Sequence, residues 1–245
     1  MLDDADQFSR ARLLASAQPE SGAWVSAIPV PSLGTQLSPD ELRIAIALRT
    51  GSKISERHLC KCGIYTDEYG FHLLSCRFSE GRHPRHAAMN DIIWRALKAS
   101  GSGAIQEPVG LNRGDGKRPD GISVGPFSRG MTLCWDATCT NTFAESFVND
   151  SAIEAGRAAA RAENSKRAKY PDLVRKYRFE PIAIETSGVY GPSTKIIIQE
   201  IGNRISQKSS DKREVMWLKQ RLSITIQRGN ALSILSLANH MTGSV

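Results

Sequence analysis

Apolar residues recur along this chain with two different spacings, which separate helices from strands. Where they recur every three or four positions the pattern predicts helices, at residues 41–49, 84–100, 146–170, 193–207 and 212–239. Short apolar runs between glycine, proline and polar residues predict strands, at residues 104–107, 118–124, 131–138 and 179–186. The second and third strands are expected to form a hairpin through a turn between Gly125 and Gly130. This order of elements predicts an α/β fold.

The N-terminal 55 residues are less regular. A short helix is expected before residue 17, and residues 19–34, rich in glycine, serine and proline, are expected to form an extended connector. Three apolar residues should anchor this connector: Trp24, Val25 and Ile28. Ser38 and Glu41 have the spacing of a capping box, which predicts a helix that starts there and ends at Gly51.

The chain is basic. Its 245 residues suffice for one sizeable domain with a smaller module, and 40% apolar and 23% charged residues are typical of a globular protein. The formal net charge of +7 makes nucleic acid or another polyanion the natural class of partner. Most of the excess lies in residues 157–178, where eight Lys and Arg residues accompany Glu163 and Asp172. A solvated helix face is the simple interpretation, but the place of this segment after two aspartates favours phosphate contact.

The sequence has no feature typical of export or of a membrane span. The N-terminus is acidic and lacks an apolar signal core, and no apolar run approaches the ~18 residues that a membrane helix needs. Five cysteines, an odd number, argue against a disulfide framework and favour thiols or metal ligands. We therefore expect an intracellular protein that is not secreted and has no membrane partner.

Four residues suited to soft metal ions lie within a span of 17 residues: Cys60, Cys62, His72 and Cys76. Thiolate and imidazole groups clustered in this way are typical of a closed, tetrahedral structural zinc site. His83 and His86 follow closely and are weaker candidates to replace or supplement a ligand. The alternative is a group of buried thiols beside a satisfied histidine. Cys134 and Cys139 are interpreted as buried thiols of that kind.

Two aspartates are expected to meet in the predicted hairpin. Asp120 begins its first strand and Asp136 lies toward the end of the second, so antiparallel pairing can bring their carboxylates together. Like charges that close are unfavourable unless a cation lies between them, so the pair predicts a site for Mg²⁺ (or Mn²⁺).

A basic string follows the aspartates at Lys166-Arg167-Ala168-Lys169-Tyr170. A lysine near a scissile phosphate can offset negative charge or orient the attacking water. Lys166 and Lys169 are both candidates, because residues three apart lie on neighbouring faces of a helix. Tyr170 could donate a hydrogen bond to phosphate or cap the helix end.

These motifs, in this order, resemble the PD-(D/E)XK nuclease superfamily. More narrowly, they resemble the restriction-like endonuclease domain of non-LTR retrotransposon (reverse transcriptase) proteins. Those domains carry a Cys-Cys-His-Cys motif, an Arg-Pro-Asp, a second acid after a strand, and a Lys-x-x-Lys-Tyr motif. The counterparts here are residues 60–76, 118–120, 136 and 166–170. The superfamily's simpler pattern has a lysine two residues after the second acid, where this chain has Thr138.

The resemblance implies a domain order and an activity. A helical linker at residues 1–55 and a zinc knuckle at 56–82 would precede a PD-(D/E)XK core at 83–240, a mixed central sheet flanked by helices. The implied activity is metal-dependent DNA nicking in the nucleus, with DNA, and also the element's RNA, as candidate partners. The chain has no aromatic-x-Asp-Asp polymerase motif. It would therefore be the nuclease module without the reverse transcriptase.

The resemblance also implies residue roles. The implied catalytic residues are Asp120, Asp136, Lys166, Lys169, Glu107 and Tyr170, with Asp120 and Asp136 as the magnesium ligands. The implied contacts to DNA are Arg118, Arg157, Arg161 and Arg167. Glu107 is included because superfamily members often carry a further acid upstream; a surface carboxylate is the alternative.

Two other functions fit the same residues. The chain could be a catalytically inactive, zinc-stabilised nucleic-acid-binding relic, or a zinc-organised protein-interaction domain whose positive charge serves solubility. Two further residues are given structural interpretations. Glu185 is expected to be a strand-end carboxylate paired with a basic helix residue, and Trp135 a core residue.

Overall fold

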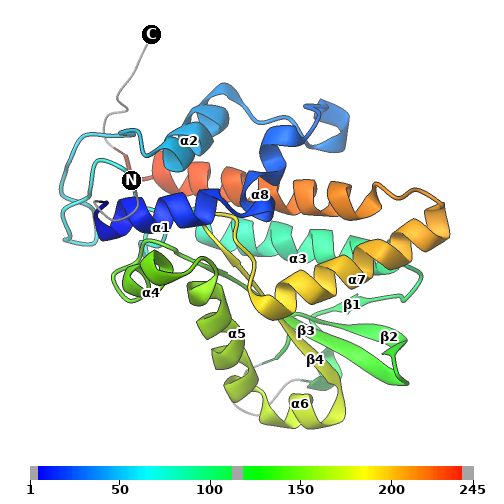
Figure 1. The fold of residues 1–245 in the computed structure, drawn as a ribbon. Helices are drawn as coiled ribbons and strands as arrows, with labels where there is room; N and C mark the ends of the chain where they lie inside the picture. The colour runs from blue at the N-terminus through cyan, green and yellow to red at the C-terminus, as the bar shows by residue number, and fades with distance from the viewer. Residues whose placement is uncertain (1–4, 112–117, 239–245) are drawn as a thin grey trace.

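A four-stranded mixed sheet forms the centre of the chain (Figure 1). The computed structural model describes residues 5–111 and 118–238. The strand order is β1 (Ile105–Gln106), β2 (Gly121–Ser128), β3 (Met131–Thr140) and β4 (Arg178–Glu185). β2 pairs antiparallel with both β1 and β3, whereas β4 pairs parallel with β3. The predicted α/β class, with a mixed sheet flanked by helices, is confirmed.

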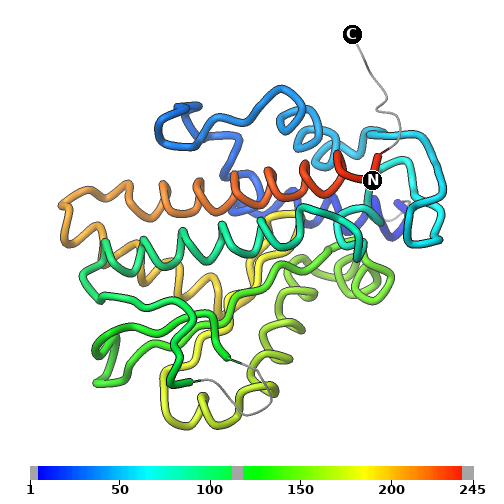
Figure 2. The backbone as a smooth tube through the Cα atoms, turned by 180° about the vertical axis from the view of Figure 1, so that it is seen from behind, coloured from blue at the N-terminus to red at the C-terminus, as the bar shows by residue number. Residues whose placement is uncertain are grey.

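Helices cover both faces of this sheet. Their bounds are α1 (Gln7–Ser16), α2 (Pro39–Thr50), α3 (Arg82–Ala99), α4 (Val148–Ile153), α5 (Arg157–Lys169), α6 (Pro171–Lys176), α7 (Pro192–Ser209) and α8 (Glu214–Leu235), with short 3-10 turns η1 (Pro19–Ser26), η2 (Pro31–Leu33) and η3 (Val109–Leu111). α3, α7 and α8 lie on one face of the sheet, and α5 and α6 lie on the other (Figures 1 and 2). No helix in the described ranges has the length and apolar character needed to cross a membrane.

The alternation of side chains along β3 assigns each residue to one face. Leu133, Trp135 and Ala137 pack into the core formed with α3, α7 and α8. Cys134 packs on the other face with Tyr170, at the end of α5. Successive side chains of a strand point to opposite faces, so Asp136 is directed toward α5. The core position expected for Trp135 is confirmed, since its side chain is fully buried.

The connection from β3 to β4 differs from the single helix predicted at residues 146–170. It consists of α4, a break, α5 and α6. Gly156 lies in the break with φ +91°, a conformation that favours glycine. A Cβ there would lie 3.3 Å from the backbone oxygen of Tyr190. The predicted single helix is therefore wrong, because tertiary contact requires a turn where local propensity allows helix.

The hairpin is also longer than expected. β2 continues to Ser128, and the reversal occurs at Arg129 and Gly130, both with positive φ. The turn does not begin at Gly125, because β2 accommodates its central residues through irregular register with β3. The polar turn expected at residues 111–117 lies outside the described residues beyond Leu111.

The N-terminal region packs against the rest of the chain. Ser38 and Glu41 form the predicted capping box, and Gly51 ends α2 with φ +77°. Trp24 is buried as expected, but Val25 and Ile28 are 61% and 76% exposed, so these two do not anchor the connector. Apolar residues of α1, α2, the Cys/His segment (residues 60–76) and the end of α8 share one hydrophobic cluster: Ala11, Ile44, Leu48, Cys60, Leu74, Cys76 and Ile234.

We predict that Gly121→Ala destabilises the fold by about 1–3 kcal/mol, because overpacking forces neighbours to shift. A Cβ at Gly121 would lie 2.0 Å from the Trp135 ring, which β2–β3 pairing places directly opposite. Urea unfolding measures the change. Gly125→Ala, on the same strand with nothing within 4 Å of the added Cβ, is the matched control and should change stability by less than about 0.5 kcal/mol. Equal effects of the two substitutions would contradict this packing.

Candidate functional site

Strands β2 and β3 bring Asp120 and Asp136 close together. Asp120 lies just before β2, where Gly121 pairs with Trp135 of β3. Its Oδ2 accepts a hydrogen bond of 2.6 Å from the backbone N–H of Ala137, the residue after Asp136. The side chains are mostly buried, with 19% of Asp120 and 4% of Asp136 exposed. The pair expected from the sequence is therefore present.

The pKa values of the two carboxylates are shifted in opposite directions. Burial alone would raise the pKa of Asp120, but hydrogen bonding and charge from His86 and the N–H of Ala137 lower it. Burial raises the pKa of Asp136; Lys166 opposes this shift, and the negative charge of Asp120 reinforces it. Asp136 is thus the carboxylate that most requires a neighbouring cation.

Lys166 on α5 provides such a cation. Its Nζ lies 2.8 Å from Oδ2 of Asp136. Nζ of Lys169 lies over the ring of Tyr170, 4.5 Å from its centroid, and its charge also lowers the pKa of Asp136. Of the two lysines left open by the sequence, Lys166 makes the close ion pair with the aspartate.

Glu163 helps to set the orientation of α5 and hence of Lys166. It is buried and accepts hydrogen bonds from the backbone N–H groups of Ser193 and Thr194, at 3.0 and 2.9 Å. The hydroxyl of Thr194 adds a third bond of 2.8 Å. These donors are at the N-terminus of α7, where a carboxylate is favourable. Glu163 therefore links α5 to α7 one turn before Lys166.

His86 belongs to this site and not to the Cys/His cluster. Its Nε2 lies 3.3 Å from Oδ2 of Asp120 and 3.3 Å from the carbonyl oxygen of Ala137. The hydrogen bond to Asp120 raises the pKa of His86. The side-chain amide of Asn90, one turn further along α3, lies beside the imidazole at 3.3 Å and accepts a hydrogen bond from the Trp135 indole. The spacing of His86 and Asn90 on one helix face was the available signal, and sequence reasoning missed it.

Tyr170, Arg118 and Glu107 surround Asp120 through internal contacts. The Tyr170 ring is buried, and its hydroxyl donates to the backbone oxygen of Arg118 at 2.7 Å. The backbone N–H of Tyr170 ends α5 by donating to Lys166 and Arg167. Arg118 pairs with the exposed carboxylate of Glu107, whose backbone N–H donates to the oxygen of Asp120 at 2.8 Å. Tyr170 and Glu107 thus support the Asp120 segment, which differs from the direct catalytic contacts expected of them.

The arginines expected to contact DNA all have partners within the chain. Arg157 pairs with Glu154 at 3.1 Å, and Arg161 pairs with Asp150 at 2.7 Å. Arg167 donates to the Ser193 hydroxyl, and its guanidinium lies 4.0 Å from Glu180. The three side chains remain between 37% and 54% exposed. Exposed ion pairs contribute only about 0–1 kcal/mol, so these partners leave the arginines available to an anion.

Cys60, Cys62, His72 and Cys76 converge on one point. Their ligand atoms all lie within 4.8 Å of one another, and in the described part of the chain no other group of three or more such side chains does so. Sγ of Cys60 is 3.6 Å from Sγ of Cys76, and Sγ of Cys62 is 3.2 Å from Nε2 of His72. This group could hold a metal ion, as the sequence predicted. His83 is not part of it.

Local structure holds these ligands in place. The carboxylate of Asp67 accepts hydrogen bonds of 2.9 Å from three backbone N–H groups, including that of His72. A hydrogen bond from the backbone of Ile64 lowers the pKa of Cys62, whereas burial raises the pKa of Cys76 to about 11. Because metals bind thiolates, a bound cation would relieve the burial penalty at Cys76.

The partners of the Glu185 carboxylate differ from the basic helix residue that the sequence predicted. It is fully buried at the end of β4, and its carboxylate accepts hydrogen bonds from the hydroxyls of Thr142 and Ser187 and from the N–H of Ala159. Hydroxyl and backbone donors take the place of the basic helix residue that the sequence predicted. Burial raises the pKa of Glu185.

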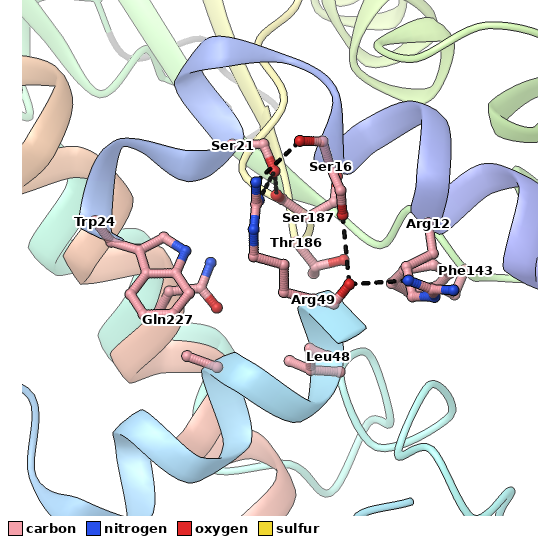
Figure 3. A pocket seen from close by; sticks show the side chains of 11 residues that line it. Arg12, Ser16, Ser21, Trp24, Leu48, Arg49, Phe143, Thr186, Ser187 and Gln227 are labelled. Carbon is pink, nitrogen blue, oxygen red and sulfur yellow. Dashed lines mark hydrogen bonds between the residues drawn. The ribbon is translucent and has the colours of Figure 1, made fainter. Parts of the chain in front are cut away.

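A small cavity beside Thr186 and Ser187 is lined by Arg49 and Ser21 (Figure 3). Its volume of about 20 Å³ accommodates one water molecule and no substrate. This region is therefore structural.

Neither a scan against models of known protein families nor a search among curated proteins finds a match for this chain. The chemical interpretation of the site therefore rests on its side chains. They comprise two largely buried aspartates, a lysine 2.8 Å from one of them, and a histidine 3.3 Å from the other.

We predict that Asp120→Asn lowers the pKa of His86 in Mg²⁺-free buffer, because the carboxylate contact raises it. In the folded protein the pKa of His86 lies above the value of about 6.5 for an unfolded chain. The contact with Asp120 therefore contributes its full stabilisation below a pH of about 6.5. That contribution is lost as the pH rises through the raised pKa. NMR titration of the histidine ring signals measures the shift, with the His83 signal as an internal control. A His86 titration unaffected by the substitution would contradict the contact.

Proposed function

We propose that this chain is a metal-dependent DNA endonuclease that nicks phosphodiester bonds. The observation that carries the proposal is the juxtaposition of Asp120 and Asp136, with Nζ of Lys166 2.8 Å from the second carboxylate. Two acids can hold a divalent ion that assists phosphodiester hydrolysis, and a lysine beside them can offset negative charge on the phosphate.

The element order supports membership in the PD-(D/E)XK superfamily. Along the chain, α3 is followed by β1, the β2–β3 hairpin, a connection made of α4, α5 and α6, and then β4, so the order is helix, strand, hairpin, helices and strand. This is the order on which the resemblance to the restriction-like endonuclease of non-LTR retrotransposon proteins rests. The acids lie on the hairpin, and the lysine lies on the helix that connects it to β4.

The carboxylates are suited to Mg²⁺ or Mn²⁺. Both ions prefer oxygen ligands, and Mg²⁺ is typically held by one or two carboxylates while it keeps several waters. The raised pKa of Asp136 reflects a buried anion that a divalent cation would stabilise. When bound, the ion supplies Lewis acidity: it lowers the pKa of a water ligand and offsets charge on the phosphate.

The remaining groups have distinct roles in this proposal. Asp120 and Asp136 bind the cation, and the ammonium of Lys166 stabilises negative charge on the phosphate or orients the attacking water. His86 positions Asp120 through its Nε2 and is not assigned a direct contact with the substrate. Tyr170 holds the Arg118 backbone next to Asp120.

The basic α5–α6 segment is the proposed DNA contact. It lies on the face of the sheet toward which Asp136 is directed (Figure 1). Arg157, Arg161 and Arg167 project from α5 and remain partly exposed. Contacts of this type position the backbone without reading sequence. Action on chromosomal DNA would place the chain in the nucleus.

We further propose that the Cys/His cluster holds structural zinc. Three thiolates and one imidazole match the ligand preference of Zn²⁺ and fill a tetrahedral site, leaving no position for substrate. Cys60 and Cys76 belong to the hydrophobic cluster that joins α1, α2 and α8. The ion would therefore stabilise the N-terminal half of the protein.

A catalytically inactive DNA-binding module is the second candidate. It is favoured by the state of Asp136, whose carboxylate is only 4% exposed and already neutralised by Lys166. A metal would have to displace that ammonium. The nicking assay below separates the two functions.

We predict that the wild-type chain nicks supercoiled plasmid DNA in Mg²⁺ or Mn²⁺. Asp120→Ala, Asp136→Ala and Lys166→Met should each lower the rate by about 100-fold or more, because the aspartates would hold the cation and Lys166 would offset negative charge on the phosphate. Lys169→Met should lower it by less than about tenfold. Asp91→Ala is the control for loss of a carboxylate, since Asp91 is an exposed partner of Arg95 on α3.

If no nicking is observed, DNA binding measured on the same samples shows whether the protein still binds its proposed substrate. Wild-type protein that is folded and binds plasmid but never nicks it would contradict the endonuclease proposal in favour of the binding module. A larger loss at Lys169 than at Lys166 would contradict the assigned lysine.

We predict one zinc per chain by elemental analysis. Cys76→Ser should lower the zinc content and reduce the thermal midpoint by about 10 °C, which corresponds to roughly 3–5 kcal/mol for a chain of this size. Cys139→Ser, which removes a thiol outside the cluster, should retain the metal. Full zinc occupancy in Cys76→Ser would contradict the assigned site.

A further inference from the structure

A wide groove lies between α1, the Cys/His segment and the loop that joins β3 to α4. Its volume is about 760 Å³, within the range of about 300–1,000 Å³ typical of ligand sites. It includes none of the residues proposed to act on DNA. His72 contributes to its lining, so the proposed zinc would stabilise one of its walls.

Aromatic rings line the groove; those of Phe71 and Phe143 are buried, whereas those of Phe8 and Tyr69 are partly exposed. Phe71 stacks on Phe143 with ring centroids 4.1 Å apart, and Phe8 and Tyr69 stack on Phe71 at 5.5 and 5.6 Å. Ile64 and Tyr65 also line the groove and are 57% and 63% exposed. Apolar side chains gathered in this way at an open concave surface are typical of an interaction site.

The residues that line the groove carry a net negative charge, whereas the net charge of the whole chain is +7. Three carboxylates line it, from Asp6, Asp67 and Glu145, against one guanidinium, that of Arg12. Arg12 already donates to the backbone oxygen of Arg49 at 3.0 Å. A nucleic-acid backbone would be repelled here, whereas cationic side chains would be attracted.

The partly exposed ring of Tyr65 already attracts one cation of the chain itself. The guanidinium of Arg57, which does not line the groove, lies 5.3 Å from the centroid of this ring. Arginine and lysine side chains are stabilised over tyrosine faces, and nearby carboxylates add to that attraction. Tyr69 is 37% exposed and lines the same groove.

We propose that this groove binds a basic peptide segment of a partner protein, in which Lys or Arg residues neighbour an aromatic or aliphatic residue. The apolar side chain packs on the exposed parts of Ile64, Phe8 and Tyr69. The basic side chains lie beside Glu145, Asp6 and the Tyr65 ring. The chain thereby has a protein-docking surface that adjoins its basic α5–α6 face at Ser146, whose backbone oxygen accepts a hydrogen bond of 2.8 Å from Arg161.

The test is a phage-display selection of random twelve-residue peptides on the zinc-containing protein of 245 residues. Selected sequences should be enriched in Arg or Lys together with aromatic or aliphatic residues. A synthetic peptide of the enriched sequence is then titrated by fluorescence anisotropy. Tyr65→Ser and Glu145→Lys should each weaken its binding by about tenfold, the size of a single strong interface contact.

Matched controls separate the groove from general effects. Phe78→Ser removes an exposed aromatic ring of the same segment that does not line the groove. Glu214→Lys makes the same charge change at the start of α8. Both should bind the peptide within about twofold of wild type, below the threshold of a significant contact.

Three outcomes would overturn the proposal. They are a selection with no enrichment, an enrichment of acidic peptides, and a peptide whose binding is unaffected by Tyr65→Ser and Glu145→Lys. A single-stranded oligonucleotide that displaces the peptide from the groove would assign this surface to nucleic acid instead. None of these results depends on nicking activity.

Discussion

Asp136 holds a carboxylate almost entirely out of water, and Lys166 is the charge that compensates for it at 2.8 Å. A buried carboxylate without a partner is strongly unfavourable, so the position of α5 and the register of β3 are linked through this ion pair. A shift of β3 by one residue would move Asp136 into the apolar core and Trp135 out of it. The ammonium of Lys166 is thereby held beside Asp136, and the pairing of β2 with β3 brings Asp120 to the same place. The proposed activity depends on this arrangement.

The surrounding contacts restrict how these groups can move. Glu163 ties α5 to the start of α7, and Tyr170 ties its end to the backbone of Arg118. His86 and the N–H of Ala137 hold Asp120 from the other side. Functional groups supported in this way retain a fixed geometry, which is what stabilising a charged transition state requires. Cys60 and Cys76 of the Cys/His cluster pack in the hydrophobic cluster that α1, α2 and the end of α8 share.

Local signals in the sequence predicted the features that depend on local chemistry. The capping box at Ser38, the hairpin that brings Asp120 to Asp136, and the convergence of Cys60, Cys62, His72 and Cys76 all follow from residue type and spacing. Other features of the site depend on packing between residues that are far apart in the sequence. The choice between Lys166 and Lys169 depends on the rotation of α5, which Glu163 sets through residues about thirty positions away.

The same distinction explains the features that sequence reasoning missed. His86 meets Asp120 only because α3 packs across β3, and the Tyr170 hydroxyl bonds to a residue 52 positions earlier. Gly156 breaks a helix whose alanine-rich sequence favours continuation, because the backbone of Tyr190 comes close. Val25 and Ile28 are apolar but exposed. Their local sequence pattern predicts burial, but the described chain leaves most of their surface uncovered.

The divalent metal site is tested most directly by anomalous diffraction from crystals of the zinc-containing protein soaked in Mn²⁺. A manganese peak is expected between the carboxylates of Asp120 and Asp136, together with a zinc peak at Cys60, Cys62, His72 and Cys76. The zinc peak serves as the internal control for data quality. A clear zinc peak with no manganese at the aspartates would contradict the claim that these buried acids form a divalent metal site.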